Sequence, residues 1–339
     1  MNERYSRQTL FHEIGSEGQK KLCASRVLIV GCGALGASHA EMLARAGVGR
    51  LRIVDRDFVE MTNLQRQTLY SEDDAFDRVP KAAAAKERIR RINSEIEVEA
   101  VIADVNHSNI ESLIDGCDVI LDGTDNFQIR YLLNDACVKH GRTWIYGATV
   151  SSYGTTMTIR PGMTPCLRCV FPDMPDAGSS PTCDTAGVIM PIISTVSATQ
   201  VTEALKVLVG DLGSLHGSLM QFDVWANDRQ RIKLGPPEAE CATCGHREFE
   251  FLDSGSAAAT SVLCGRDAVQ VSPPSATTLD LDQLADKLKF TVAVTQNEYL
   301  LRFTVGDNEM TVFRDGRAII KGTDDIGAAR SLYARFVGS

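Results

Sequence analysis

The sequence predicts an α/β protein whose main domain is a doubly wound, mainly parallel sheet extended by antiparallel strands. Three observations support this fold class. Short apolar runs alternate with helical patterns over residues 27–150, as in proteins with helices on both faces of a parallel sheet. After residue 150 the strands alternate in polar and apolar character, which is typical of antiparallel pairing. A further strand-and-helix pattern from residue 262 predicts a small C-terminal α+β domain.

We expect three parts in the chain: an N-terminal arm and helix at 1–26, a main domain at 27–250 and a C-terminal domain at 262–339, with a linker at 235–261. In the main domain, the predicted strands are 27–30, 51–54, 98–103, 119–122, 144–148, 152–159 and 218–225. Its predicted helices are a run that ends at 46 and the segments 81–92, 108–114, 128–140 and 189–209. In the C-terminal domain we expect strands at 269–271, within 290–314 and at 318–321, and helices at 279–288 and 325–336.

The composition is that of an ordinary globular protein, with 44% apolar and 23% charged residues. A net charge of −9 argues against nucleic-acid binding, which needs a basic surface. The uncharged run at 185–202 contains Ser, Thr, Gln and Pro, so we interpret it as a buried helix and expect no membrane span. Ten cysteines without a visible signal peptide indicate a reducing, cytoplasmic location, where cysteines serve as metal ligands or thiols more often than as disulfides.

A glycine-rich turn follows the first predicted strand. It contains Gly31, Gly33 and Gly36, a Rossmann-like pattern that lets the chain turn sharply and lets phosphates approach the backbone. The helix that begins there favours an anion at its N-terminus. Asp55 ends the second strand 19 residues after Gly36, where a carboxylate suits ribose hydroxyls. Alone, these features indicate a nucleotide site and are most typical of an NAD-dependent oxidoreductase.

Two stretches beside this turn have side chains suited to phosphate groups. Residues 62–67 contain amides and Arg66, whose guanidinium matches phosphate oxygens, although a solvated loop is the more ordinary interpretation. Lys81 follows Pro80 and lies in the first turn of a predicted helix. It is either a phosphate ligand or a surface charge.

The strand predicted at 119–122 ends in a third polar stretch. The carboxyl ends of such strands are where open α/β sheets bind ligands. Asp125 is therefore a candidate ligand for Mg²⁺ beside a triphosphate. Asp125 or Asn126 is also a candidate N-cap of the next helix, and the two roles are compatible.

The cysteines form two C-x-x-C pairs and leave one further loop thiol of interest. Four thiolates in two such pairs favour a closed, structural zinc site, whereas one pair alone would leave buried or redox thiols as an equal interpretation. The ligands would be Cys166, Cys169, Cys241 and Cys244. Cys183 lies in a loop at 171–185, outside both pairs, and is either a nucleophile or a free thiol without a role.

With these residues assembled, the chain resembles the ThiF/MoeB/HesA family, the bacterial relatives of ubiquitin-activating enzymes. The resemblance extends from the arm at residues 4–8 to Cys244. It includes the glycine turn, residues 55–57, 63–67, 80–81, 124–126 and 182–187, and both cysteine pairs. Residues 146–154 and 264–271 are more similar to the longer ThiF-type members of Gram-positive bacteria than to the shorter MoeB type. One departure is Ala34, where some members have another glycine.

The resemblance implies roles for individual residues. Asp55 would hold the ribose, Arg66 and Lys81 would contact phosphates together with Asn63, and Asp125 would bind Mg²⁺. Arg7 would reach into the site of the other subunit of a homodimer. Cys183 corresponds to a family cysteine implicated in covalent linkage to the carrier. The full implied ATP site is Gly31, Gly33, Ala34, Gly36, Asp55, Asp57, Asn63, Gln65, Arg66, Lys81, Asp125 and Asn126.

The resemblance also implies an activity, in which residues 27–250 form an adenylation domain. Members adenylate the C-terminal glycine of a ubiquitin-like sulfur carrier that ends in Gly-Gly, with ATP, Mg²⁺ and Zn²⁺ as cofactors. A persulfide donor such as a cysteine desulfurase then supplies sulfur. The carrier would be ThiS-like, for the thiamine thiazole, or MoaD-like, for molybdopterin. An NAD-dependent oxidoreductase and a zinc-stapled scaffold that binds a ubiquitin-like partner without activating it are the alternatives from other classes.

Overall fold

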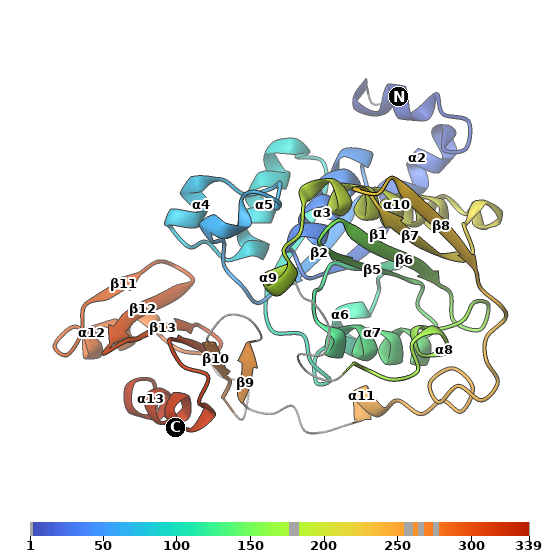
Figure 1. Ribbon diagram of the computed structural model, residues 1–339. Helices are drawn as coiled ribbons and strands as arrows, with labels where there is room; N and C mark the ends of the chain where they lie inside the picture. The colour runs from blue at the N-terminus through green and yellow to red at the C-terminus, as the bar shows by residue number, and fades with distance from the viewer. Residues whose placement is uncertain (1–2, 176–182, 254–259, 264–267, 274–277, 339) are drawn as a thin grey trace. The chain divides into compact units, whose positions relative to one another are not determined.

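The computed structural model describes residues 3–175, 183–253, 260–263, 268–273 and 278–338, and the chain divides into two compact units (Figure 1). Unit 1 is Met1–Gly255 and unit 2 is Ser256–Ser339. Each unit has its own sheet and its own apolar core.

Unit 1 is built on an eight-stranded sheet in the order β3-β2-β1-β4-β5-β6-β7-β8. The strands from β3 to β5 are parallel and those from β5 to β8 are antiparallel, so the predicted fold class is confirmed. The strands are β1 Arg26–Val30, β2 Arg50–Asp55, β3 Glu97–Ile102, β4 Val119–Asp122, β5 Trp144–Val150, β6 Tyr153–Ile159, β7 Ser218–Asp223 and β8 Asp228–Lys233.

Helices cover both faces of this sheet (Figure 1). The apolar side chains of β1 alternate, so that Val27 and Ile29 pack in one core cluster and Leu28 and Val30 in the other. The first cluster contains helices α2 Gly15–Ala24, α3 Ala34–Ala46, α5 Lys81–Ile92 and α10 Met190–Val209, and the second contains α6 Ile110–Ile114, α7 Phe127–Lys139, α8 Leu167–Val170 and α11 Glu250–Asp253. Shorter helices are η1 Glu3–Tyr5, α1 Ser6–Thr9, η2 Met61–Asn63, α4 Glu72–Phe76, α9 Cys183–Ala186 and η3 Leu212–Ser214.

Helix α10 is the uncharged segment for which we predict burial. Among the described residues it is the one helix long and apolar enough to cross a membrane, by length and composition. It packs against α3 and strands β4 to β7, and 56% of its apolar window is buried within the protein. These contacts confirm that it is a core helix of unit 1.

Two strands depart from the prediction. We predict no strand at Asp228–Lys233, but these residues form the edge strand β8 and pair with β7. Every residue of β8 is exposed and nearly all are polar, so the segment has no apolar pattern to reveal it. Strand β9, Thr260–Leu263, begins inside the predicted linker and pairs with β10.

Unit 2 is a six-stranded antiparallel sheet in the order β11-β12-β13-β14-β10-β9. Its remaining strands are β10 Ala268–Val271, β11 Val294–Gln296, β12 Leu300–Val305, β13 Asn308–Phe313 and β14 Ala318–Lys321, and its helices are α12 Leu281–Leu288 and α13 Ile326–Phe336. The core combines Leu284 and Phe336 from the helices with Phe303 and Ile320 from the sheet. Asp280 and Asp325 cap the two helices, so each begins one or two residues later than predicted.

Candidate active site

The glycine turn packs closely against the residue that follows β4, and the contact is made by Gly31, Gly36 and Gly123. Gly31 has φ +82°, and its N–H donates to Val54 O at 2.8 Å. A Cβ on Gly36 would lie 1.8 Å from Gly31 O, and a Cβ on Gly123 would lie 2.5 Å from the same oxygen. Gly33 differs, because the nearest described atom that a Cβ there would meet beyond its own turn is Gln67 Nε2 at 3.9 Å. The turn is therefore tightly packed below and open at Gly33.

The turn lies at the point where the strand order of the parallel sheet reverses, between β1 and β4. Strand β2 pairs with β1 on one side and β4 pairs with it on the other, so the carboxyl ends of all three meet at one edge. Open α/β sheets bind ligands at this point. Asp55 ends β2 and Asp122 ends β4, and the glycine turn follows β1 directly. The sequence-predicted nucleotide residues on these strands are thus gathered at one edge.

The Asp55 carboxylate holds the backbone of this edge. Its Oδ2 accepts from Cys32 N at 2.6 Å and its Oδ1 accepts from Asp57 N at 2.7 Å. Burial raises the pKa of Asp55, and the positive charge of Lys81 opposes that shift. Tyr70 Oη donates to Cys32 O at 2.6 Å, so both polar groups of the Cys32 backbone are satisfied. Burial also raises the pKa of the Cys32 thiol to about 12, which makes it a packing residue.

Lys81 is the first residue of α5 and is only 4% exposed. Its Nζ lies 3.3 Å from Asp57 Oδ2, and its backbone N–H donates to Asp57 O at 2.9 Å. The plainer interpretation of Lys81 as a solvated surface charge is therefore wrong. The lysine is held beside the carboxyl end of β2, within electrostatic reach of Asp55.

The loop at 62–67 is half buried, so the solvated-loop interpretation holds only for part of it. Asn63 is buried, and its Oδ1 accepts from Glu60 N at 3.1 Å. Arg66 is partly buried and donates from Nη1 to Thr62 O at 2.7 Å, whereas Gln65 is exposed. Gln67, which the implied ATP site omits, is 4% exposed and lies beside Gly33.

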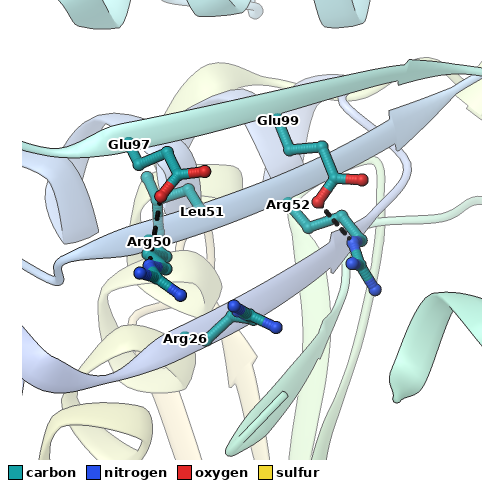
Figure 2. A pocket seen from close by; sticks show the side chains of 6 residues that line it. All are labelled: Arg26, Arg50, Leu51, Arg52, Glu97 and Glu99. Atoms are coloured by element: carbon teal, nitrogen blue, oxygen red, sulfur yellow. Dashed lines mark hydrogen bonds and ion pairs between the residues drawn. The ribbon is translucent and has the colours of Figure 1, made fainter. Parts of the chain in front are cut away.

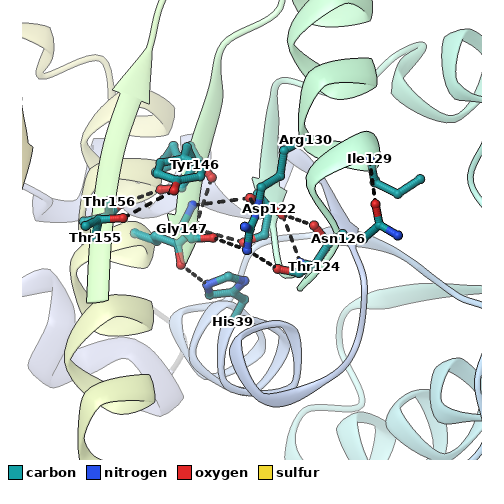
Figure 3. A network of polar contacts seen from close by, with 12 residues as sticks. His39, Asp122, Thr124, Asn126, Ile129, Arg130, Tyr146, Gly147, Thr155 and Thr156 are labelled. Carbon is teal, nitrogen blue, oxygen red and sulfur yellow. Dashed lines mark hydrogen bonds and ion pairs between the residues drawn. The ribbon is translucent and has the colours of Figure 1, made fainter. Parts of the chain in front are cut away.

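A buried polar network fixes the loop that follows β4 (Figure 3). Asp122 Oδ2 lies 3.2 Å from Arg130 Nε, and Asp122 Oδ1 accepts from Thr124 N and Oγ1 at 2.9 and 2.7 Å. Arg130 Nη2 donates to Thr124 O at 2.6 Å. Asn126 accepts from Ile129 N at 3.3 Å and caps α7, so the capping role belongs to Asn126.

Asp125 is the exposed member of this loop. Burial works to lower the pKa of Arg130, but the carboxylates of Asp122 and Asp125 raise it above its usual value. Burial also works to lower the pKa of Arg56, but the carboxylates of Asp104, Asp57 and Asp125 raise it above its usual value. Asp125 thus lies within electrostatic reach of two arginines at the sheet edge, with its oxygens accessible to a cation.

Gln200 and His39 support the network from behind. Gln200 Nε2 donates to Asp122 O at 3.0 Å and to Ile145 O at 3.1 Å, so its Oε1 accepts from His39 Nε2 at 2.8 Å. This arrangement assigns the His39 proton to Nε2. Burial lowers the pKa of His39 to about 4, and the imidazole is neutral near pH 7.

The two cysteine pairs come together although 71 residues separate them in the sequence. The four Sγ atoms all lie within 4.8 Å of one another, with 3.6 Å from Cys166 to Cys241 and 3.3 Å from Cys169 to Cys244. The sulfur atoms of a tetrahedral zinc–thiolate site lie about 3.8 Å apart, so a Zn²⁺ ion fits among these four cysteines. Burial and the neighbouring Cys169 raise the pKa of Cys166 to about 12, which a bound cation would reverse.

Helix α7 supports this cluster. Asn134 Oδ1 accepts from Leu167 N at 2.8 Å, between the first two cysteines. Asp135 accepts from Thr243 Oγ1 at 3.1 Å and from Phe251 N at 2.9 Å. The same helix begins at the Asp122–Asn126 loop, so one element connects the cysteine cluster with the nucleotide edge.

Comparison with known proteins decides the family. The model of the ThiF family matches residues 5–243. The chain belongs to the ThiF family. A relative named sulfur carrier protein ThiS adenylyltransferase, from Bacillus subtilis (strain 168), is 46% identical over 340 residues and the alignment covers all of both chains. The SAMP-activating enzyme E1 of Haloferax volcanii is 40% identical over 251 residues, which are 74% of this chain and 92% of that protein.

Solved structures with this fold include E. coli MccB with ATP. Its TM-score is 0.63 at 23% identity, over 72% of this chain and 75% of that chain. At that identity the likeness supports the fold alone. The expected membership of the family and the expected fold are both confirmed.

Arg7 lies far from the nucleotide edge of its own chain. It is exposed on α1, which neighbouring residues attach to the C-terminal ends of α3 and α5. Gln8 Nε2 donates to Ala46 O at 2.8 Å, and Tyr5 Oη accepts from Asn93 Nδ2 at 2.9 Å. The glycine turn is at the other end of α3, whose 13 residues span about 20 Å. The structure therefore does not bring Arg7 together with Arg66 and Lys81.

Cys183 is a further predicted site residue of this ThiF-family chain. Cys183 begins α9, but its side chain and residues 176–182 are outside the described part, so its expected role stays a prediction.

A surface pocket at the amino ends of the parallel strands contains ion pairs of 3.1 Å between Arg50 and Glu97 and 2.8 Å between Arg52 and Glu99 (Figure 2). It is at the opposite end of the strands from Asp55 and has no part in the site described above.

Proposed function

We propose that the chain adenylates the C-terminal glycine of a ubiquitin-like, ThiS-like sulfur carrier. The reaction uses ATP, releases pyrophosphate and prepares the carrier for thiocarboxylate formation in thiamine thiazole biosynthesis. The observation that carries the proposal is the 46% identity to a ThiS adenylyltransferase along the whole chain, unit 2 included. A cytoplasmic enzyme is consistent with the cysteine content and the buried helix α10.

The geometry of the nucleotide edge supports ATP binding there. The open face of Gly33 and the N-terminus of α3 favour an anionic group, and Lys81 and Arg66 lie on neighbouring segments with positive charges. Both Asp55 oxygens retain a lone pair for the ribose after their backbone bonds. Asp125 is the exposed carboxylate that would hold Mg²⁺, which neutralises phosphate charge when bound.

The chemical step asks for alignment more than for proton transfer. The carboxylate of the carrier attacks the α-phosphorus of ATP, the new acyl–phosphate bond forms, and the bond to pyrophosphate breaks. A carboxylate nucleophile has no proton to lose, so the site needs no general base. Lys81 and Arg66 would stabilise charge on the phosphates, and the Asp122–Arg130 network would hold the loop that carries Asp125.

We propose that the chain acts as a homodimer, and the exposed position of Arg7 is consistent with this. Its distance along α3 from the glycine turn supports action in the site of the partner subunit, where its charge would assist Lys81 and Arg66. The four cysteines would hold a structural Zn²⁺, since a site with four protein ligands has no open position. A persulfide donor would then supply sulfur to the adenylated carrier, and Cys183 is the candidate for a covalent linkage.

The same reaction on a MoaD-like carrier is the second candidate. It is favoured by relatives such as the adenylyltransferase and sulfurtransferase MOCS3 of Aedes aegypti, which is 37% identical over 241 residues, 71% of this chain and 55% of that protein. We further propose that residues 262–339 form an autonomous domain that contributes to carrier binding or to the dimer.

ATP–pyrophosphate exchange tests the activity. The purified chain is incubated with ATP, labelled pyrophosphate and either a ThiS-like or a MoaD-like carrier that ends in Gly-Gly. We expect exchange with the ThiS-like carrier and none with the same carrier truncated by its last two glycines. Exchange with neither carrier would refute the enzymatic proposal, and exchange with the MoaD-like carrier alone would favour the second candidate.

A further inference from the structure

Gln67 has a buried side-chain amide that forms no hydrogen bond with the residues that the structure describes. The residue is 4% exposed, and its backbone is held by a 3.0 Å bond from its N–H to Asn63 O. Its Oε1 is fully buried, yet neither atom of its amide forms a hydrogen bond with any residue in the described part of the chain. Buried amides are nearly always paired in folded proteins, so the unpaired Nε2 indicates an absent acceptor, and the unpaired Oε1 indicates an absent donor.

The Gln67 amide faces the open side of the glycine turn. Among the described residues outside its own turn and helix, Gln67 Nε2 is the one atom within 4 Å of the position that a Cβ on Gly33 would occupy, at 3.9 Å. By contrast, the equivalent positions at Gly31 and Gly36 are filled by backbone atoms. The second glycine of such a turn is where a phosphate group approaches the backbone. The unpaired amide therefore borders the space that this group would enter.

The neighbouring polar side chains each have a hydrogen bond within the protein. Asn63 Oδ1 accepts from Glu60 N, and Arg66 Nη1 donates to Thr62 O. The conformation of the turn is held by Asp55 and Tyr70, which satisfy both backbone groups of Cys32. Gln67 is thus not needed to shape the turn, and its amide is available for a ligand.

We propose that Gln67 is a nucleotide-binding residue that donates from Nε2 to a phosphate oxygen above Gly33. An uncharged donor adds direction without adding charge, which differs from the contributions of Lys81 and Arg66. Nε2 already lies on the side of Gly33, and phosphate oxygens, which only accept hydrogen bonds, match this donor. The inference deepens the proposed function, because it assumes that ATP binds at this edge.

Equilibrium binding of ATP to three variants of the full chain tests the inference. Gln67→Met keeps the length of the side chain but removes both polar atoms, and Gln67→Glu replaces the donor with a negative charge. We expect Gln67→Met to weaken ATP binding about tenfold, which corresponds to one lost hydrogen bond, and Gln67→Glu to weaken it further. Adenosine, which has no phosphate, should lose much less affinity.

The matched control is Gln270→Met, a glutamine of unit 2 that is also buried, with 2% exposure. It should leave the affinity for ATP unchanged. Thermal unfolding separates binding from folding, because Gln67→Met removes no hydrogen bond within the described protein and should unfold at or above the wild-type temperature. ATP affinity equal to wild type in Gln67→Met would overturn the inference, as would an equal loss for adenosine and ATP. If the wild-type chain itself does not bind ATP, the proposed function fails first.

Discussion

Asp122 and Arg130 form a buried ion pair at the carboxyl end of β4, with 3.2 Å between Oδ2 and Nε. Arg130 also donates to Thr124 O, and its guanidinium lies 5.5 Å from the ring centroid of Tyr146. The pair therefore ties the first turn of α7 to the loop that precedes it. Because Asp125 is in that loop, the ion pair holds the segment that carries the candidate metal ligand.

Replacing Arg130 with methionine should destabilise the protein strongly. The substitution removes one partner and leaves the Asp122 charge buried, which typically costs about 3–5 kcal/mol. Arg90→Met is the control, because Arg90 and Glu87 are exposed and 4.0 Å apart, and it should change the free energy of unfolding by less than about 0.5 kcal/mol. Urea unfolding measures both variants. Similar costs for the two would show that the buried pair is not a stabilising feature.

Alanine substitutions at two glycines of the turn should affect different properties, stability in one case and ATP binding in the other. In Gly36→Ala the Cβ would overlap Gly31 O, so the turn must move, and we expect a loss of about 3 kcal/mol or more. In Gly33→Ala the Cβ has space, so stability should hardly change while the affinity for ATP falls about tenfold or more. Thermal unfolding and ATP binding are measured on both. Wild-type affinity in Gly33→Ala would argue against phosphate binding at this turn.

His39 should make stability depend on pH. Burial lowers its pKa to about 4 in the folded chain, from an ordinary value of 6.5. Between these two values the unfolded chain binds a proton that the folded chain does not, so the stabilising contribution is complete above 6.5 and is lost as the pH falls. The loss from about pH 7 to pH 5 should be about 2 kcal/mol. Urea unfolding at several pH values in this range should show that the free energy of unfolding changes less steeply with pH in His39→Gln than in the wild type. Identical pH dependence in the two proteins would contradict the assignment.

The parts of the site that the sequence predicts are those with a local cause. The glycine turn, Asp55 and the first residue of α5 follow from strand, turn and helix patterns within a few residues. Arg130 has no predicted role, and Gln67 belongs to the predicted phosphate-binding stretch but not to the implied ATP site, since the importance of each residue depends on a contact with another segment. Strand β8 escaped prediction because it is exposed on both faces and depends on pairing with β7. Such residues can be told apart from ordinary surface residues only when their neighbours in the folded chain are known.

Removal of one cysteine of the cluster should abolish zinc binding. Cys244→Ser leaves three thiol ligands and a weak hydroxyl, so the zinc content should fall from about one per chain to near zero. The protein should also lose stability, because α8 and the segment that contains Cys241 and Cys244 are no longer joined through the metal. Cys117→Ser is the control, since Cys117 is buried away from the cluster. Metal analysis of the purified proteins gives the result. Unchanged zinc content in Cys244→Ser would rule out a four-cysteine site.

Mixing two inactive variants should restore activity if Arg7 serves the partner subunit. Arg7→Ala and Lys81→Ala should each lose pyrophosphate exchange, because each removes a positive charge from the phosphates. In a mixed dimer, one site has an intact Lys81 and receives Arg7 from the partner, so that random mixing should restore about a quarter of the sites. The variants are unfolded together, refolded and assayed against each variant refolded alone. Absence of recovery in a mixture that contains mixed dimers would place Arg7 in the service of its own chain, against the distance of about 20 Å along α3.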